Sequence, residues 1–201
     1  TRPERYHHGD LKNALLLAAE KLLVEAGTAG LSLRAVAKSA GVSHAAPYRH
    51  FTDKAALLRA LAQAGFERLR DAIETAADAA PHDAGQKLIA AGGAYVVQAV
   101  HNRELTQLMF GGGMDHGEDA DLREAAAAAF ESLVRIIAAG VEAGAFRDRD
   151  PRELALVAWT GMHGLAMLIA AGLLQVDAGD PMQVDALVRS VAENLIYGIS
   201  K

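Results

Sequence analysis

The chain of 201 residues contains no cysteine. This absence excludes a disulfide framework, a thiolate nucleophile and any zinc or iron–sulfur site built on cysteine. The length is sufficient for one large domain or two small ones with a buried core, so the fold does not need covalent crosslinks.

Catalytic motifs are also lacking. There is no nucleophile elbow and no Walker loop, and the glycines at 111–113 have no strand before them or helix after them to form a phosphate cradle. His101 and His116 with Asp115 or Glu118 could surround a metal, but their spacing matches no compact ligand motif. We therefore expect no enzyme activity, no metal and no cofactor.

The N-terminal segment "TRPERYHHGDLK" is polar and lacks the apolar run of a signal peptide, which favours a cytoplasmic protein. One stretch, Leu154 to Val176, has no charged residue and is long enough to span a bilayer. Acidic residues, Glu153 and Asp177, bracket it in place of Lys or Arg, and it contains histidine, glutamine and three glycines. A buried helix that faces a partner is favoured over a membrane segment.

The net charge of −5 conceals a division of charge along the chain. Residues 1–60 hold nine Lys or Arg against five acidic residues, a net of +4, and the remainder therefore carries −9. Such asymmetry favours a nucleic-acid-facing head joined to an acidic body. The alternative is that the asymmetry arose by chance and that the charges lie on solvated helix faces.

Apolar residues recur at helical spacing along almost the whole chain, and no stretch alternates with a period of two. The pattern predicts an all-α protein of about nine helices. We expect them at about 10–26, 33–40, 43–51, 54–79, 84–100, 103–110, 120–143, from Pro151 through the uncharged stretch, and at 182–199.

The stretch "LSLRAVAKSAGVSHAAPYRHF" has the parts of a helix-turn-helix. Ser32 is placed to cap its first helix, and Gly41 ends that helix. Asp53 is placed to cap the long helix that follows. We expect a DNA-binding head at 1–59 and a ligand-binding and dimerisation domain at 60–201.

Pro47 falls inside the expected second helix of this motif. If Ser43 is the N-cap, the missing N–H of Pro47 forfeits only the first intrahelical hydrogen bond, and if His44 is the cap it forfeits none. Ala45 and Ala46 leave little bulk on the leading edge, so the helix could approach base edges and thymine methyl groups. The proline thus marks the start of a reading helix, and the alternative is a sterically tolerated turn with no role.

From Gly9 to Leu61 the chain resembles the DNA-binding head of the tetracycline-repressor (TetR) family. The Gly-Val turn, the Tyr-x-x-Phe ending and the Asp-Lys start of the next helix occur together in "LSLRAVAKSAGVSHAAPYRHFTDKAALL". The rest resembles the family only in helix count and in "AWTGMHGLAMLIAAG", which is similar to the regulatory domain of one branch. That branch also tends to begin with a segment like "YHHGDL".

The resemblance implies phosphate contacts at Tyr48, His50 and Lys54, with Arg49 and Ser43 as further ones. It implies base contacts at Arg34 and His44. Because alanine side chains offer no hydrogen bonds, specificity would depend on Arg34, His44 and DNA shape. The expected DNA-binding set is Arg34, Ser43, His44, Ala45, Ala46, Tyr48, Arg49, His50 and Lys54.

Family members usually pair as two-fold dimers through their last two helices. Gly161, Gly164 and Ala166 would allow close helix approach here. The last helix also carries an apolar stripe that a solvated surface would not tolerate, although an intramolecular core is the alternative. The stripe consists of Val184, Leu187, Val188, Val191, Leu195 and Ile199.

An effector pocket should be mostly apolar with a few polar groups. Methionine repacks easily, so a methionine-rich and aromatic set predicts an adaptable cavity, in which His163 is either a ligand contact or a satisfied core residue. The candidates are Tyr95, Met109, Phe110, Met114, Phe130, Trp159, Met162, His163 and Met167.

Together these features predict a one-component regulator, in the form of a repressor. Its homodimer would bind a palindromic double-stranded DNA operator and release it when a small hydrophobic effector binds. The alternative is a helical carrier or scavenger of hydrophobic molecules whose basic head serves solubility.

Overall fold

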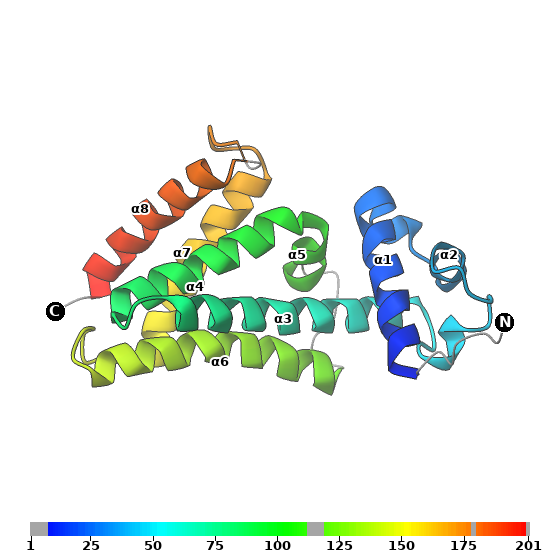
Figure 1. Cartoon of the computed structure of the whole chain (residues 1–201), viewed down its shortest axis with the longest axis horizontal. Helices are drawn as coiled ribbons and strands as arrows, with labels where there is room; N and C mark the ends of the chain where they lie inside the picture. The colour runs from blue at the N-terminus through cyan, green and yellow to red at the C-terminus, as the bar shows by residue number, and fades with distance from the viewer. Residues whose placement is uncertain (1–7, 112–118, 178–179, 200–201) are drawn as a thin grey trace. The chain divides into compact units, whose positions relative to one another are not determined.

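The computed structural model describes residues 8–111, 119–177 and 180–199. Within these residues the elements are all helical, which confirms the all-α prediction (Figure 1). They are α1 (His8–Gly30), α2 (Leu33–Ser39), the 3-10 helix η1 (Pro47–Arg49), α3 (Lys54–Ala79), α4 (Ala84–His101), α5 (Arg103–Phe110), α6 (Ala120–Glu142), α7 (Pro151–Ala170) and α8 (Pro181–Ile199).

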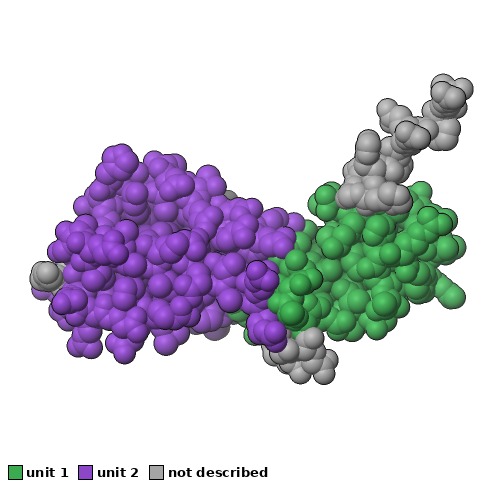
Figure 2. Space-filling model, turned by 90° about the horizontal axis from the view of Figure 1, so that it is seen from below, with its two compact units in different colours: residues 1–65, 104–122 green, residues 66–103, 123–201 purple. Residues whose placement is uncertain are grey.

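The chain forms two compact units (Figure 2). Unit 1 comprises residues 1–65 and 104–122, and unit 2 comprises residues 66–103 and 123–201. Segment 104–122, which contains α5, therefore packs in the same unit as the N-terminal helices. The functional division of the chain at residue 59 stays a prediction.

The core of unit 1 is made by the apolar faces of the N-terminal helices. Leu15, Leu23, Val36, Leu57 and Leu61 have almost no exposed surface. Each contributes roughly 1.5–3 kcal/mol by leaving water. The burial holds α1, α2 and the start of α3 as one packed body.

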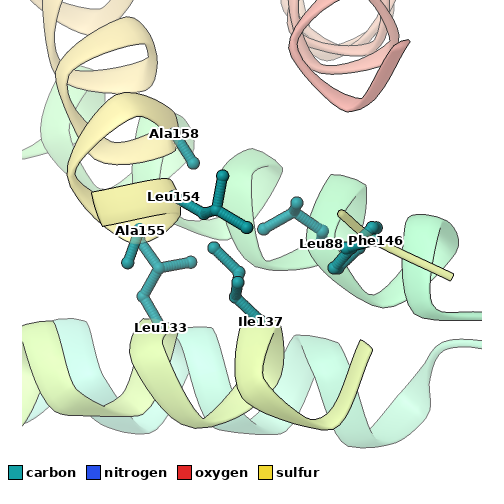
Figure 3. Packing of buried hydrophobic residues seen from close by; sticks show 7 residues of the cluster. All are labelled: Leu88, Leu133, Ile137, Phe146, Leu154, Ala155 and Ala158. Atoms are coloured by element: carbon teal, nitrogen blue, oxygen red, sulfur yellow. The ribbon is translucent and has the colours of Figure 1, made fainter. Parts of the chain in front are cut away.

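The core of unit 2 joins α4, α6 and α7 (Figure 3). The Phe146 ring lies against Gly140 of α6, where a β-carbon would collide with the ring. This glycine therefore lets the turn after α6 fold back on the helix. The buried cluster consists of Leu88, Leu133, Ile137, Phe146, Leu154, Ala155 and Ala158.

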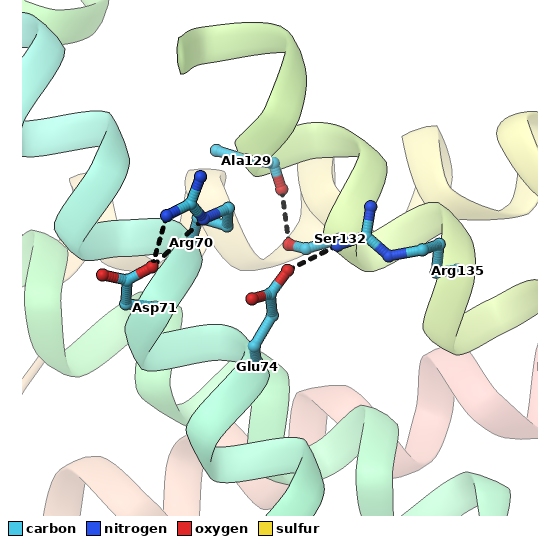
Figure 4. Close-up of polar contacts among 6 residues, drawn as sticks. All are labelled: Arg70, Asp71, Glu74, Ala129, Ser132 and Arg135. Carbon is cyan, nitrogen blue, oxygen red and sulfur yellow. Dashed lines mark hydrogen bonds and ion pairs between the residues drawn. The ribbon is translucent and has the colours of Figure 1, made fainter.

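Polar contacts add to the packing of α3 and α6 within unit 2 (Figure 4). Arg135 of α6 pairs with Glu74 of α3, while Ser132 donates to the Ala129 carbonyl at 2.7 Å. Because the Arg135–Glu74 pair is largely exposed, we expect it to contribute at most about 1 kcal/mol.

The uncharged helix α7 begins as predicted, with Pro151 in its first turn and the Asp150 side chain accepting from the Arg152 backbone N–H at 2.9 Å. By length and composition α7 could cross a membrane. Core helices of globular proteins can have the same length and composition. Its buried residues pack against α4 and α8. Helix packing therefore accounts for one apolar face of α7.

Candidate functional site

The helix-turn-helix begins at a capped helix. Ser32 Oγ accepts from the Ala35 backbone N–H at 3.1 Å, as the sequence predicted. Gly41 has a φ of 68°, a left-handed conformation that glycine adopts without steric cost, and Val42 N–H then bonds to the Ala37 carbonyl at 3.0 Å. The Gly-Val pair thus closes α2 and turns the chain toward Pro47.

The predicted α-helix over 43–51 is wrong. The chain forms turns followed by the short 3-10 helix η1 at Pro47–Arg49. Pro47 has no N–H for the Ser43 carbonyl, and this carbonyl instead accepts from Ala46 N–H at 2.9 Å, one residue earlier than an α-helix requires. Neither Ser43 nor His44 is the N-cap, which is Ala46.

The DNA-binding candidates lie on α2, the turn, η1 and the start of α3, and α2 packs against η1. Tyr48 is 53% exposed, and Arg34 and Arg49 are also exposed. Ser43, His44 and Ala45 are exposed as well, while Ala46, His50 and Lys54 are partly buried. The predicted set therefore occupies one accessible region of unit 1.

Acidic partners do not neutralise the basic side chains of this region. None of Arg34, Arg49 and Lys54 forms an ion pair with another residue in the described part of the chain. Asp53, the nearest acid in sequence, is exposed and its Oδ1 accepts from the Ala56 backbone N–H at 2.8 Å, so it caps α3 as predicted. The region keeps a positive charge that suits a phosphate backbone.

A partly buried ion pair lies elsewhere in unit 1. Arg59 Nε donates to Asp119 Oδ2 at 3.0 Å, and Asp119 Oδ1 accepts from the Leu122 backbone N–H at 3.1 Å. The Leu122 hydrogen bond, followed by the Arg59 guanidinium, lowers the pKa of Asp119. The pair connects α3 to the residue that precedes α6. No local pattern in the sequence indicates this pair, because the two residues lie 60 positions apart.

In unit 2 the structure brings four of the predicted effector-binding side chains together. Tyr95 of α4 lies edge-on to His163 of α7, with Oη 2.6 Å from Nδ1. The Trp159 ring centroid lies 6.0 Å from that of His163 and 5.9 Å from that of Phe130. These rings form one continuous aromatic wall from α4 to α6.

Burial shifts the pKa values of Tyr95 and His163, the two titratable side chains among these rings. It raises the pKa of Tyr95 to about 12, although a hydrogen bond from Trp159 opposes the rise. It also lowers the pKa of His163. At neutral pH both side chains are therefore uncharged.

Arg152 was missed as a member of this group. Its guanidinium carbon lies 5.6 Å from the Phe130 centroid, and it pairs with Glu131. Arg152 precedes Trp159 by seven positions, about two helical turns, so helical spacing alone could have placed the two on one face.

The remaining effector candidates that the structure describes are divided between the two units. Met162 is buried beside Gly92 in unit 2, and Met167 is partly buried in the same helix. Met109, beside Gly65, and the partly buried Phe110 belong to unit 1. Met114 lies outside the described residues, as do the candidate metal ligands His116, Asp115 and Glu118. The part of the chain that the structure describes contains no cluster of three metal-ligating side chains.

The apolar stripe on α8 faces mainly inward. Val188 is 1% exposed and Val184 is also buried, while Leu195 lies against Gly161 of α7. Leu187 and Val191 are partly buried, and the side chain of Ile199 lies outside the description. Much of the stripe is thus explained by packing within the chain. Exposed apolar side chains lie on α7 as well, where Leu156 and Val157 are 50% and 49% exposed.

Comparisons with known proteins agree with this architecture. Residues 15–61 match the family model for bacterial regulatory proteins of the tetR family, and residues 88–195 match the tetracyclin repressor-like C-terminal domain. A search of the curated proteins found no match.

Several solved structures share the fold. A protein with unknown function from Rhodococcus sp. RHA1 is 41% identical, with 99% of this chain and 100% of that chain covered and a TM-score of 0.86. The fatty acid degradation regulator FadR from Bacillus halodurans is 22% identical, with 95% and 97% covered and a TM-score of 0.76. The TetR family transcriptional regulator PfmR from Thermus thermophilus is 22% identical, with 93% and 99% covered and a TM-score of 0.69.

A helix-turn-helix head and a helical C-terminal domain define a DNA-binding transcriptional regulator. The chain belongs to the tetR family of bacterial regulatory proteins. This confirms the resemblance on which the site residues were assigned.

Proposed function

We propose that the chain is a cytoplasmic one-component transcriptional repressor. Its homodimer binds a palindromic operator and leaves it when a small hydrophobic effector binds the C-terminal domain. The observation that carries the proposal is the region around η1, where Arg34, Arg49 and Lys54 lack acidic partners in the described part of the chain.

On the DNA side, the proposal divides the side chains by chemistry. Tyr48, Arg49, His50, Lys54 and Ser43 would hold phosphates, which fix position without reading sequence. Arg34 and His44 would reach base edges, and the short side chains of Ala45 and Ala46 let the turn come close to the groove. Because Pro47 is buried and fixes its own φ, this segment has little freedom to lose on binding.

The dimer would form through α7 and α8. Among the described residues, a β-carbon at Gly164 would have no atom within 4 Å beyond its two chain neighbours and the backbone of its own helix. A helical glycine costs about 1 kcal/mol relative to alanine, and packing inside the protomer gives no reason for it here. Close approach by a second copy supplies that reason, and the exposed Leu156, Val157 and Leu168 would supply the apolar contact.

The effector signal would reach the head through segment 104–122. This segment shares unit 1 with the head, and its Leu105 and Met109 lie against Gly65 of α3. The Arg59–Asp119 ion pair ties the end of the segment to α3 as well. An effector can act only if it binds one of two arrangements of the protein more tightly than the other. The position of α5 would therefore have to differ between these two arrangements.

The test is DNA binding by the full chain to the promoter region beside its own gene, compared with random DNA at several salt concentrations. We expect a clear preference for the promoter, and the loss of about 0.9 from the log–log salt slope in Lys54→Ala. Lys87→Ala, a lysine of α4 in unit 2, is the control and should keep the slope. Equal affinity for promoter and random DNA would contradict the proposal.

A further inference from the structure

One side of α8 is exposed and carries a row of polar side chains. α8 packs against α4 and α7, and its Val184, Val188 and Ala192 are buried (Figure 1). Along another side of the helix, exposed residues recur at every fourth position and therefore form one continuous ridge. This α8 ridge consists of Asp185, Arg189, Glu193 and Tyr197.

The charges of the α8 ridge are only weakly paired within the chain. Arg189 Nη2 lies 3.8 Å from Asp185 Oδ2, beyond hydrogen-bond distance, and the two side chains are 45% and 66% exposed. Glu193 forms no ion pair in the part of the chain that the structure describes. Tyr197, at the end of the ridge, is 85% exposed. The ridge therefore keeps groups that can pair with another molecule.

The row beside the α8 ridge is low. Ala186 and Ser190 are exposed and small, and Asn194 Nδ2 donates to the Ser190 carbonyl at 2.7 Å, so the amide lies along its own helix. A β-carbon at Gly198 would have no atom within 4 Å among the described residues, apart from its chain neighbours and its own helix backbone. Helices pack by inserting such a ridge into such a groove, so this face suits a second α8.

The order of charges along the ridge selects the orientation of a second copy. If two α8 helices paired in parallel about a two-fold axis, each side chain would face its own copy, and Arg189 would face Arg189 of the partner subunit. In an antiparallel pair, residues at equal distances on either side of the axis face each other. An axis at Val191, the midpoint of the ridge, makes Arg189 face Glu193 of the partner subunit. It also places Asp185 opposite Tyr197 of the partner subunit, whose hydroxyl can donate to the carboxylate.

An antiparallel register centred on Leu187 is the competing arrangement. It would pair Asp185 with Arg189 of the partner subunit. It would also place Glu193 opposite position 181 and Tyr197 beyond the start of α8, so two of the ridge groups would lack a complement. Exposed ion pairs add little affinity, and their main effect is to discriminate between registers and partners.

We propose that α8 pairs with the α8 of a second copy in antiparallel orientation, with Val191 at the two-fold axis. Arg189 and Glu193 determine this register and make the chain select its own copy over a chain with another charge order on this face. The inference rests on the proposed function, since it specifies how the proposed homodimer forms.

Charge exchange between two variants of the full chain tests the pairing. Arg189→Glu would make both cross-subunit contacts acidic in its homodimer, and Glu193→Arg would make both basic. After co-expression with tags of different mass, only the mixed dimer has opposite charges in both contacts. Native mass spectrometry should show the mixed dimer rising from about half, the statistical share, to about three quarters or more. Contacts within one helix are the same in mixed and pure dimers, so they do not produce this result.

The matched control combines Arg189→Asp with Asp185→Arg, which change the net charge by the same amounts on the same ridge. In the proposed register the mixed dimer of this pair gains no contact over the two homodimers, so mixing should stay statistical. An excess of mixed dimer in the control would indicate the register centred on Leu187 or a general attraction between opposite charges. Either result would overturn the inference, as would statistical mixing of both pairs.

Disulfide formation measures the register directly, because the chain has no cysteine of its own. Ser190→Cys alters a residue one position from the proposed axis, so the two copies are offset by about 3 Å along the helices and should crosslink under mild oxidation. Ala186→Cys alters a residue five positions from the axis, an offset of about 15 Å, and should not crosslink. The opposite pattern, or no crosslink in either variant, would overturn the inference.

Light scattering of the unaltered chain separates the two levels of the proposal. A monomeric chain would overturn the proposed function and this inference with it. A dimeric chain whose variants mix statistically would overturn this inference alone.

Discussion

A β-carbon added to Gly65 of α3 would lie 2.6 Å from Met109 Sδ of α5. Real β-carbons do not approach a heavy atom so closely, so a side chain at this position would force the buried Met109 to shift. The contact joins the first long helix after the helix-turn-helix to the segment that we propose transmits the effector signal. Gly65 therefore offers a way to move α5 without altering either the DNA-binding residues or the aromatic wall.

Gly65→Ala should destabilise the chain by about 1–3 kcal/mol, because the added methyl overpacks the contact with Met109. It should also change the effector concentration needed to release DNA. Urea unfolding and effector titration of the promoter complex measure the two effects. Gly93→Ala is the control, since its β-carbon meets only Val188 at an ordinary 3.8 Å. Equal behaviour of the two variants would argue against coupling through α5.

Ser32→Ala should reduce the free energy of unfolding by about 1 kcal/mol, because the Ala35 N–H loses its acceptor. Ser39→Ala, at the other end of α2, removes a hydroxyl without removing the cap and should cost less. Urea denaturation of both variants gives the comparison. A Ser32 variant as stable as the unaltered chain would show that the cap contributes nothing.

Arg34→Ala should weaken binding to the operator by about 1–3 kcal/mol and leave binding to random DNA nearly unchanged, because a base contact carries sequence information. Lys38→Ala, one turn further along α2, should at most weaken both to a similar degree. Competition gel shifts with operator and random duplexes separate the two. A uniform loss in Arg34→Ala would assign this residue to a phosphate.

Gly164→Ala should have opposite effects on the protomer and on the dimer. Its β-carbon meets no neighbour among the residues that the structure describes, so the helix gains about 0.5–1 kcal/mol, while the proposed partner approach is obstructed. Light scattering over a concentration series should show more monomer than the unaltered chain does, and Gly164→Leu should increase this effect. Gly161→Ala, which would contact Leu195 at 2.8 Å, should instead destabilise the protomer.

Stability should fall as the pH drops below about 6.5, the ordinary pKa of histidine. Burial lowers the pKa of His163 in the folded chain, so below pH 6.5 the unfolded chain binds more protons at this position than the folded one. The contribution of neutral His163 to the free energy of unfolding is complete above pH 6.5, and it is lost as the pH falls toward the pKa of the folded chain. Urea unfolding of the unaltered chain and of His163→Gln at pH 7.5 and 5.5 should show a smaller decrease in the variant. A decrease of equal size would remove His163 as the cause.

Local chemistry made much of the fold predictable. Ser32, Asp53 and Pro151 mark helix starts through bonds or backbone angles within a few residues, and all three stand where the sequence placed them. The first helix was predicted to end at about residue 26, and Gly27 comes directly after that position. It has a φ of 63° and kinks α1 there, although the helical assignment continues to Gly30. The conformation of 43–51 was mispredicted because the loss of one N–H at Pro47 converted a short α-helix into a 3-10 turn.

The sequence by itself determined the helical order, the helix-turn-helix and the family, because spacing, caps and turn residues act over a few positions. Only the tertiary structure decided what covers each apolar face, since periodicity marks a face without naming its neighbour. It turned Val188 inward, placed Met109 in unit 1 and Tyr95 in unit 2, and joined Tyr95 to His163 across 68 positions. Those choices depend on long-range packing, in which a buried hydroxyl must find its acceptor wherever the fold supplies one.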